Sequence, residues 1–280
     1  MVPSLDGVNG KLSRAKDHLE HLKRVLSERS DAEAVQTVTV NEQTKRWTYE
    51  VAIKQPPEVP LLARLLIGDI VHALAAALDH LVFQLSLSHQ LRTGNLRALE
   101  VCEAYKTHFP IFPSTKDGAE SRINKRLSLM AQAPADLIRG MQPYQRTADD
   151  PSLNVAEDPL WILFKLDVID KHRVVLTTNE VVAAHSVTIT SRGVEPQVIN
   201  VPEDAIKWQP FKDSTQLLHL SFNPGEVLKP DVKLNLACTL SVQFAETGLW
   251  CDGKPVVALL TLLIRYIEIA VIGELAPHVG

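Results

Sequence analysis

The sequence predicts an α+β protein, a helical bundle with an N-terminal β-hairpin and an antiparallel β-rich insertion before the last helix. Two hydrophobic patterns predict this class. Residues 11–27 carry the apolar spacing of a helix face, and residues 61–88 and 256–275 are long apolar runs of helical length. Residues 46–54 and 232–244 instead alternate apolar and polar side chains, as a strand with one buried face does.

The chain opens with a helix and a hairpin. Apolar residues step by three and four positions along residues 11–27, which indicates one apolar face: Leu12, Ala15, Leu19, Leu22 and Leu26. The segments AVQTVTV (34–40) and RWTYEVAIK (46–54) follow, separated by a short polar stretch, and predict the hairpin. The prolines of QPPEVP (55–60) then end it, because proline cannot donate a backbone hydrogen bond.

Helices are expected through the middle of the chain. A long helix over residues 61–88 leads into the irregular segment THFPIFPSTKDG (107–118), and shorter helices follow at about 119–132 and 134–141. Residues 141–159 are expected to form a loop. Asp158 and Pro159 have the types that favour the N-cap and the first position of a helix, so the next helix should begin there and end near Arg173.

Beyond residue 174 the pattern changes to that of antiparallel strands. Four segments alternate: HSVTITSR (185–192), QVINV (197–201), LLHLSF (217–222) and VKLNLACTLSVQF (232–244). We expect a single domain over residues 1–280. Its helical part would cover 1–173 and 255–280, and its β-rich insertion would cover 174–254.

Composition excludes several classes of protein. Of the side chains, 45% are hydrophobic and 22% are charged, and the net charge of -4 favours neither nucleic acid nor an anionic membrane. Three cysteines without a C-x-x-C pair argue against disulfides or a thiolate zinc site. The N-terminus lacks the apolar core of a signal peptide, and Arg265 and Glu268 interrupt the most apolar helix. We therefore expect a cytoplasmic protein without a membrane segment. The chain also lacks a glycine-rich phosphate loop, a G-x-S-x-G elbow and an H-E-x-x-H motif, so we expect no cofactor.

A first polar patch lies on the long helix. Between residues 65 and 83 the only ionisable side chains are Asp69, His72, Asp79 and His80. At 100° of rotation per residue these four fall within an arc of about 100° on an otherwise apolar helix. The stripe must face water, a cavity or a partner, because an unpaired buried charge costs several kcal/mol.

A second polar patch ends the helix DPLWILFKLDVIDKHR (158–173). After the apolar turns come Asp167, Asp170, Lys171, His172 and Arg173. Basic groups in the last turn meet the negative end of the helix dipole, which contributes roughly 0.3–1 kcal/mol. Lys171 and Arg173 thus have an ordinary structural explanation, whereas imidazoles beside carboxylates are held in the orientation that acid–base chemistry requires.

The spacing of Asp69 and His72 also resembles half of a metal site. Helix bundles hold paired metal ions with carboxylate-x-x-His motifs, and His80 or Asp79 would add ligands. A complete site needs further carboxylates from other helices, for which Asp170 is available. The sequence has no second carboxylate-His pair at this spacing. We expect no metal, and if one binds, Asp69, His72 and His80 are the candidate ligands.

Five segments resemble a widespread family of bacterial proteins whose function is uncharacterised. They are GDIVHALAAALDHL (68–81), HFPIF (108–112), QPY (142–144), DPLWILFKLDVIDKHR (158–173) and GKPVVALLTLLIRYIE (253–268). The family pattern of the first segment contains R-x4-H, which is similar to the motif of HEPN-type proteins. The resemblance implies a helical dimer, and in such dimers the motif often cleaves RNA without a metal.

This chain departs from the family pattern at two positions. Ala73 replaces an asparagine and Ala75 replaces the arginine, while Asp79 and His80 are kept. An alanine cannot clamp a phosphate, and the loss of such a clamp costs orders of magnitude in rate. Nuclease activity would require Lys171 or Arg173 to supply the missing charge from the neighbouring helix.

The leading hypothesis is a non-enzymatic helical binding module. Asp79, His80, Asp170, His172 and Arg173 would form one polar cluster, with Lys171 beside it, that locks the arrangement of two helices. The β-rich insertion would supply the binding surface. We expect a homodimer, and a protein or RNA as partner.

Two alternatives remain open. The first is a HEPN-like, metal-independent ribonuclease in which His80 or His172 acts as general acid and base and Arg173 contacts the phosphate. The second is a metal-binding helical bundle that uses Asp69, His72, His80 and Asp170.

Overall fold

The computed structural model describes thirteen segments of the chain. They are residues 2–28, 33–41, 46–54, 59–100, 107–116, 118–150, 152–172, 178–191, 194–200, 209–210, 215–222, 233–246 and 248–280. The chain folds into two compact units. The helical unit comprises Met1–Ser27, Pro60–Thr177 and Phe244–Gly280, and the strand unit comprises Glu28–Val59 and Thr178–Gln243. In the strand unit side chains are described only for Glu28, Val59 and residues 241–243, and elsewhere only the backbone is described.

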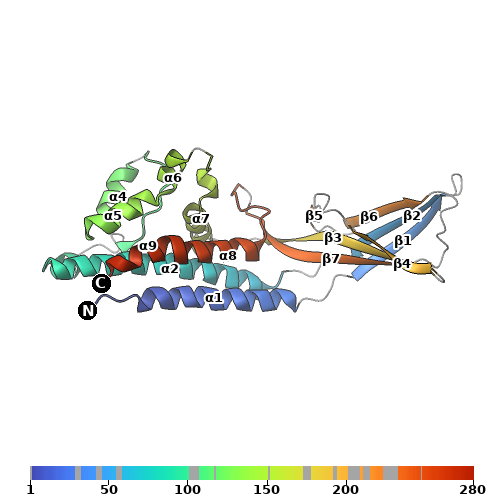
Figure 1. Ribbon diagram of the computed structural model, residues 1–280, viewed down its shortest axis with the longest axis horizontal. Coiled ribbons are helices and arrows are strands. Elements are labelled where there is room, and N and C mark those ends of the chain that lie inside the picture. The colour runs from blue at the N-terminus through green and yellow to red at the C-terminus, as the bar shows by residue number, and fades with distance from the viewer. Residues whose placement is uncertain are drawn as a thin grey trace. The chain divides into compact units, whose positions relative to one another are not determined.

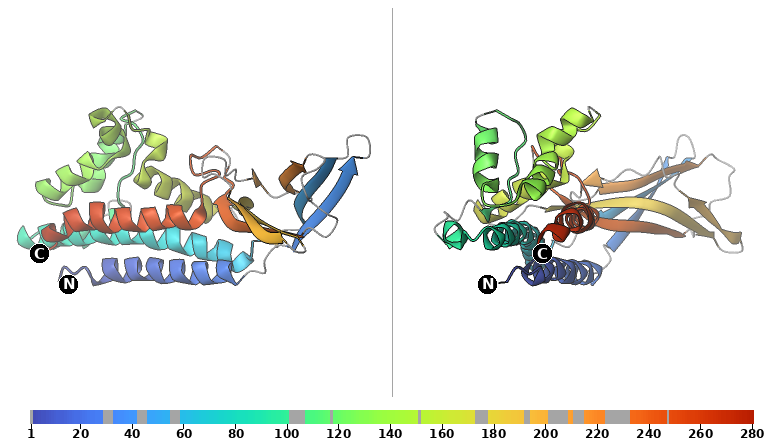
Figure 2. Two further views of the ribbon diagram at one scale, coloured as in Figure 1. Left: turned by 45° about the vertical axis from the view of Figure 1, so that its right-hand side comes forward. Right: turned by 60° about the vertical axis from the view of Figure 1, so that its left-hand side comes forward.

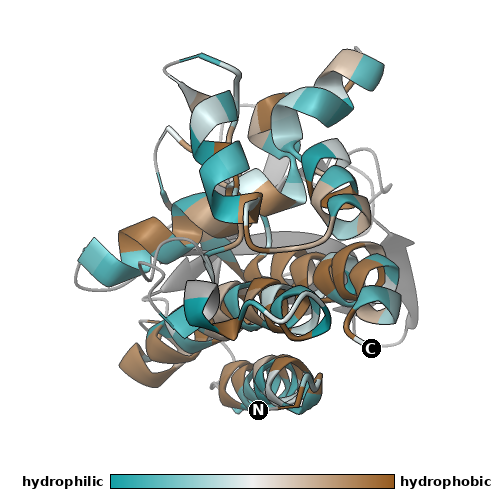
Figure 3. Cartoon of the chain, turned by 90° about the vertical axis from the view of Figure 1, so that its left-hand side faces the viewer, coloured by the Kyte–Doolittle hydropathy of each residue, from teal (hydrophilic) through white to brown (hydrophobic). Residues whose placement is uncertain are grey.

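Three long helical segments form the centre of the helical unit. They are α1 (Asp6–Ser27), α2 (Leu61–Arg92) and a C-terminal run made of α8 (Val256–Tyr266), a π-helical segment (Ile267–Ile272), α9 (Gly273–Leu275) and a final 3-10 turn (Ala276–His278). All three lie side by side along their lengths (Figures 1 and 2). In the end-on view of Figure 3 the C-terminal run is mostly apolar, whereas α1 has one apolar and one polar face.

Shorter helices complete the helical unit. They are α3 (Leu96–Glu100), α4 (Ala119–Leu127), α5 (Gln132–Gly140), α6 (Pro143–Asp149), a 3-10 turn (Val155–Glu157) and α7 (Pro159–His172). α7 packs against α2 and α8. Helix α6 and the 3-10 turn lie where the sequence predicts a loop, because Pro143 starts a helix at its first position.

The core of the helical unit is centred on α2. Its fully buried side chains recur on most turns: Ile67, Ile70, Leu74, Leu78, Leu81 and Leu85. Several neighbours surround this helix, since α1, α7 and α8 all contact it. The helix is therefore apolar on nearly all sides. Its few ionisable residues lie where they face solvent or a polar group of a neighbouring helix.

The predicted α+β class is wrong for the part of the chain whose side chains are described. That part is a helical bundle, 72% of it is helix, and it contains no hairpin or sheet. The end of β7 (Lys233–Phe244) is the one strand there, and it has no paired neighbour within that part. The physical reason is that the long apolar helices bury their faces on one another, so the bundle needs no sheet to complete its core.

Backbone pairing in the strand unit forms two antiparallel sheets. In the first, β2 (Arg46–Lys54) lies between β1 (Glu33–Asn41) and β6 (Thr215–Phe222). In the second, β3 (Thr178–Ser191) pairs with β4 (Val194–Asn200), β5 (Gln209–Pro210) and β7. In the register of the first sheet, Glu33 lies opposite Lys54 and Trp47 lies opposite Phe222.

Two helical runs of the described chain are long and apolar enough to cross a membrane by length and composition. They are α2 and the run Val256–His278. The buried core helix of a water-exposed bundle passes the same test. In the helical unit 56% of the apolar window of α2 and 44% of that of the C-terminal run are buried.

Candidate functional site

One face of α2 carries the candidate site. Gly68, His72, Ala75 and Asp79 are spaced by four, three and four residues, so they lie on one stripe. This stripe faces α7. His72 contacts Asp167, Gly68 contacts Asp170, and Ala75 and Asp79 line a cavity with α7 residues. Ala75 therefore lines this cavity with a side chain too small to fill it.

Asp79 anchors the segment that contains HFPIF. Its Oδ1 accepts a hydrogen bond of 2.8 Å from the backbone N–H of Phe109, and its Oδ2 lies 3.6 Å from Nδ1 of His108. Burial raises the pKa of Asp79, while the Phe109 N–H, His108 and Lys171 oppose that rise. The carboxylate therefore has a positional role, because it ties α2 to a segment 30 residues away in the chain.

Arg126 of α4 closes the other side of this segment. Its Nη1 donates to the carbonyl of Phe109 at 3.5 Å, and its guanidinium lies 5.4 Å from the centre of the Phe112 ring. Burial lowers the pKa of Arg126, and Asp79 opposes that fall. An arginine remains charged despite such a shift. Asp79 and Arg126 thus hold Phe109 by its N–H and its carbonyl.

Asp167 links α7 to α2. Its side chain is 10% exposed, and its two oxygens face different side chains: Oδ1 lies 3.4 Å from Nδ1 of His72, and Oδ2 lies 2.5 Å from Nζ of Lys171. Asp170, one turn further on, lies against Gly68. Burial first, and Asp167 second, raise the pKa of Asp170.

Between these groups lies a cavity of about 150 Å³, which we call the polar cleft. Its polar lining consists of Asp79, His108, Arg126, Asp167 and Lys171, and its apolar lining includes Leu78, Phe109, Ile111, Leu163 and Phe164. An apolar floor with a few convergent polar groups is typical of a binding cleft. The arrangement can hold a ligand that carries both an apolar and a charged group.

Gln142 holds the far end of the same segment. It is fully buried, its Oε1 accepts from the Phe112 N–H at 3.1 Å, and its Nε2 donates to the carbonyls of Pro110 and Ile138 at 2.9 and 3.0 Å. The HFPIF segment is thus fixed by Asp79 at one end and by Gln142 of the QPY segment at the other. This fixation keeps Phe109 and Ile111 in the wall of the cleft.

Asp158 sets the position of α7. The prediction that it caps this helix is confirmed, since its Oδ1 accepts from the N–H groups of Leu160 and Trp161 at 2.9 and 3.3 Å. Its Oδ2 pairs with Nη1 of Arg146 at 3.1 Å, and the same Nη1 donates to the hydroxyl of Tyr266. Burial raises the pKa of Asp158 against the opposing effect of Arg146. One buried carboxylate therefore joins α6, α7 and α8.

The predicted site residues separate in space. The structure brings Asp79 and Lys171 together in the polar cleft, with Asp170 beside Gly68. It places His80 elsewhere, because a Cβ built on Gly7 of α1 would lie 2.9 Å from Nδ1 of His80. His172 is exposed at the end of α7. Arg173 lies outside the described residues.

The expected single cluster divides because the polar arc of α2 is wide. Asp79 and His80 point about 100° apart around a helix, so the first faces the cleft while the second faces α1. The candidate metal ligands divide in the same way. His72 contacts α7, His80 contacts α1 and Asp69 is exposed. Among the described residues no three His, Cys, Asp or Glu side chains are grouped as metal ligands.

Two polar residues of the cleft have no role in the sequence-based hypotheses. His108 opens the HFPIF segment, for which proline predicts an irregular stretch but no site. Arg126 lies on the exposed, charged helix α4, and no spacing rule distinguishes it from Arg122 or Lys125. Only the fold brings Arg126 to Phe109.

Comparison of the chain with protein-family models, with curated proteins and with solved structures finds no match.

Proposed function

We propose that the protein is a non-enzymatic binding module, in which the polar network around Asp79 and Asp167 holds the cleft in a fixed shape. The observation that carries this proposal is the pairing of the cleft's carboxylates. Asp79 accepts from Phe109, and Asp167 contacts His72 and Lys171. Paired groups that join distant segments fix an arrangement, and a preformed cleft loses less entropy when it binds a partner.

The position of Phe164 suggests where a partner docks. This side chain lines the polar cleft and is 37% exposed, so an apolar group faces solvent next to Lys171 and Asp167. Aromatic side chains are enriched at interaction surfaces. The partner would cover Phe164 and reach the polar side chains behind it.

Site-specific photo-crosslinking in cells tests this proposal. A benzophenone amino acid at position 164 should yield one defined covalent adduct, whereas the same amino acid at the exposed position of Ile269 should not. The adduct at position 164 should weaken when Asp79→Ala releases the Phe109 segment. No adduct at position 164, or the same adducts from both positions, would contradict the proposal.

The ribonuclease alternative makes a different prediction for the same protein. RNA incubated with the wild-type protein and a chelator should remain intact if the module is not an enzyme. Metal-independent cleavage that disappears in His80→Ala or His172→Ala would replace the binding proposal with the ribonuclease. The binding module is supported by the positions of the two histidines, since His80 of α2 lies against Gly7 of α1 and His172 is exposed at the end of α7.

A further inference from the structure

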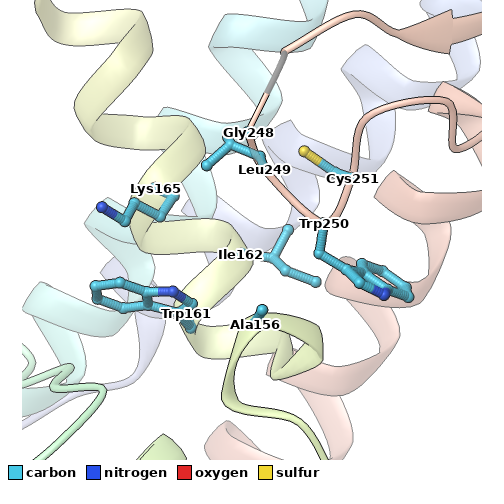
Figure 4. Close-up of a pocket in the computed structure, with 8 residues that line it drawn as sticks. All are labelled: Ala156, Trp161, Ile162, Lys165, Gly248, Leu249, Trp250 and Cys251. Atoms are coloured by element: carbon cyan, nitrogen blue, oxygen red, sulfur yellow. The ribbon is translucent and has the colours of Figure 1, made fainter.

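A second cavity lies between α7 and the turn that precedes α8, and it has a volume of about 140 Å³ (Figure 4). We call it the indole pocket, after Trp161 on α7 and Trp250 on the turn. Ile162 lies between these two side chains in the close-up, and Lys165 stands one turn above Trp161. None of its lining residues belongs to the polar cleft.

The backbone on both sides of the indole pocket is held in place. The turn is closed where the N–H of Phe244 donates to the Lys254 carbonyl at 3.0 Å and the N–H of Gly253 donates to the Phe244 carbonyl at 2.8 Å. Gly253 has a φ of 75°, a backbone conformation that would be strained in a residue with a side chain. On the other side Asp158 caps the turn of α7 that carries Trp161. The pocket is therefore preformed.

The pocket is apolar at its base and positively charged at its edge. Cys251 is 1% exposed, and burial raises the pKa of its thiol to about 11, so this wall is neutral. The Lys165 ammonium lies 4.7 Å from the centre of the Trp161 ring, and within the described parts of the chain no carboxylate pairs with it. Lys254 lies 4.5 Å from the Trp250 ring. The carboxylates of Glu246 and Asp252 add to the rise in the pKa of the Cys251 thiol.

We propose that the indole pocket binds a small single-ring aromatic carboxylate. A cavity of about 150 Å³ is known to hold one benzene molecule, so the volume fits one ring. The ring would lie on Ile162 between the two indoles, where aromatic contacts favour it. The carboxylate would meet the Lys165 ammonium, which the Trp161 ring already orients.

Titration of the full-length protein with 4-fluorobenzoate, followed by ¹⁹F NMR, tests this assignment. Saturable line broadening is expected at millimolar ligand. Lys165→Met should weaken binding by about fivefold or more, because it keeps most of the side chain's length and removes its charge. The neutral analogue 4-fluorobenzamide should bind equally to both proteins. Lys116→Met, an equal change of charge on the exposed Lys116, is the matched control and should change nothing.

Trp161→Leu tests the aromatic part of the pocket and should weaken the binding of both 4-fluorobenzoate and 4-fluorobenzamide. Circular dichroism checks that this variant is folded. The wild-type protein offers the same test without a variant, since 4-fluorocyclohexanecarboxylate carries the charge but no aromatic ring and should bind more weakly. Absence of saturable binding, or equal affinity of the wild type and Lys165→Met for 4-fluorobenzoate, overturns the proposal. Asp79→Ala should bind the probe normally, which separates this result from the fate of the binding-module proposal.

Discussion

The carboxylate of Asp170 lies in the space that a side chain at position 68 would need. A Cβ built on Gly68 would lie 2.8 Å from Cγ of Asp170 and still closer to one of its oxygens. The Asp170 side chain can take this position against α2 only because position 68 has no side chain. Asp167 and Lys171 on the same face of α7 then reach His72 and the cleft.

Gly68→Ala should destabilise the protein by about 1–3 kcal/mol, the usual cost of overpacking. This cost outweighs the roughly 0.5–1 kcal/mol that alanine contributes over glycine inside a helix. Urea unfolding measures the change. Gly10→Ala is the matched control, because a Cβ at Gly10 would meet nothing within 4 Å, and it should stabilise α1. If Gly68→Ala also stabilised the protein, the close approach of Asp170 would be refuted.

Asp79→Ala should lower the free energy of unfolding more than Asp79→Asn does. Alanine leaves the N–H of Phe109 without its acceptor, which costs about 1–3 kcal/mol where the group is shielded from water. Asparagine keeps an acceptor oxygen for this N–H. It also removes a carboxylate whose charged form burial disfavours, as the raised pKa of Asp79 indicates, so the loss of stability should be smaller. Hydrogen exchange of the Phe109 amide follows the effect directly and should accelerate only in Asp79→Ala. Equal exchange rates in the two variants would show that this hydrogen bond does not hold the segment.

Asp158→Ala should lower the unfolding free energy by more than about 2 kcal/mol. It removes a helix cap, worth about 1 kcal/mol, and leaves the Arg146 guanidinium without its buried partner. Asp158→Asn keeps the cap but not the ion pair, so its loss should be smaller. Thermal unfolding compares the two. An equal loss in both variants would assign the whole effect to the ion pair.

The pH dependence of stability should carry the signature of Asp170. Its pKa is raised above 3.8 by burial and by Asp167, with Asp69 adding to the rise and His72 and Lys171 opposing it. The folded state therefore binds this proton more tightly than the unfolded chain does. The stabilisation that comes from protonated Asp170 is fully present below pH 3.8 and is lost as the pH rises through the folded-state pKa.

Asp170→Asn should remove that part of the pH dependence. The unfolding free energy of the wild type, measured between about pH 3 and 6, should fall relative to the variant as the pH rises. The variant keeps the contact with Gly68 because its side chain has the same shape. Parallel curves for the two proteins would contradict a raised pKa at Asp170.

Much of the helical unit could be predicted from the sequence because local rules govern it. The apolar spacing of α1, the long apolar run of α2 and the Asp158–Pro159 start of α7 follow from helix geometry and capping, and all appear in the structure. The stripe of polar residues on α2 could be predicted as well. The fold class could not be predicted correctly, because it depends on which of the helices and strands build the core.

The tertiary structure alone decided which residues form the cleft. A helical period places Asp79 and His80 in one arc, yet only the packing of α1 and α7 on different sides of α2 brings His80 to Gly7 and Asp79 to Phe109. Arg126 reaches the site from another helix through a loop held by Gln142. A sequence determines which side chains share a face through local rotation along the helix, whereas the identity of the element that covers that face depends on contacts between residues far apart in the chain.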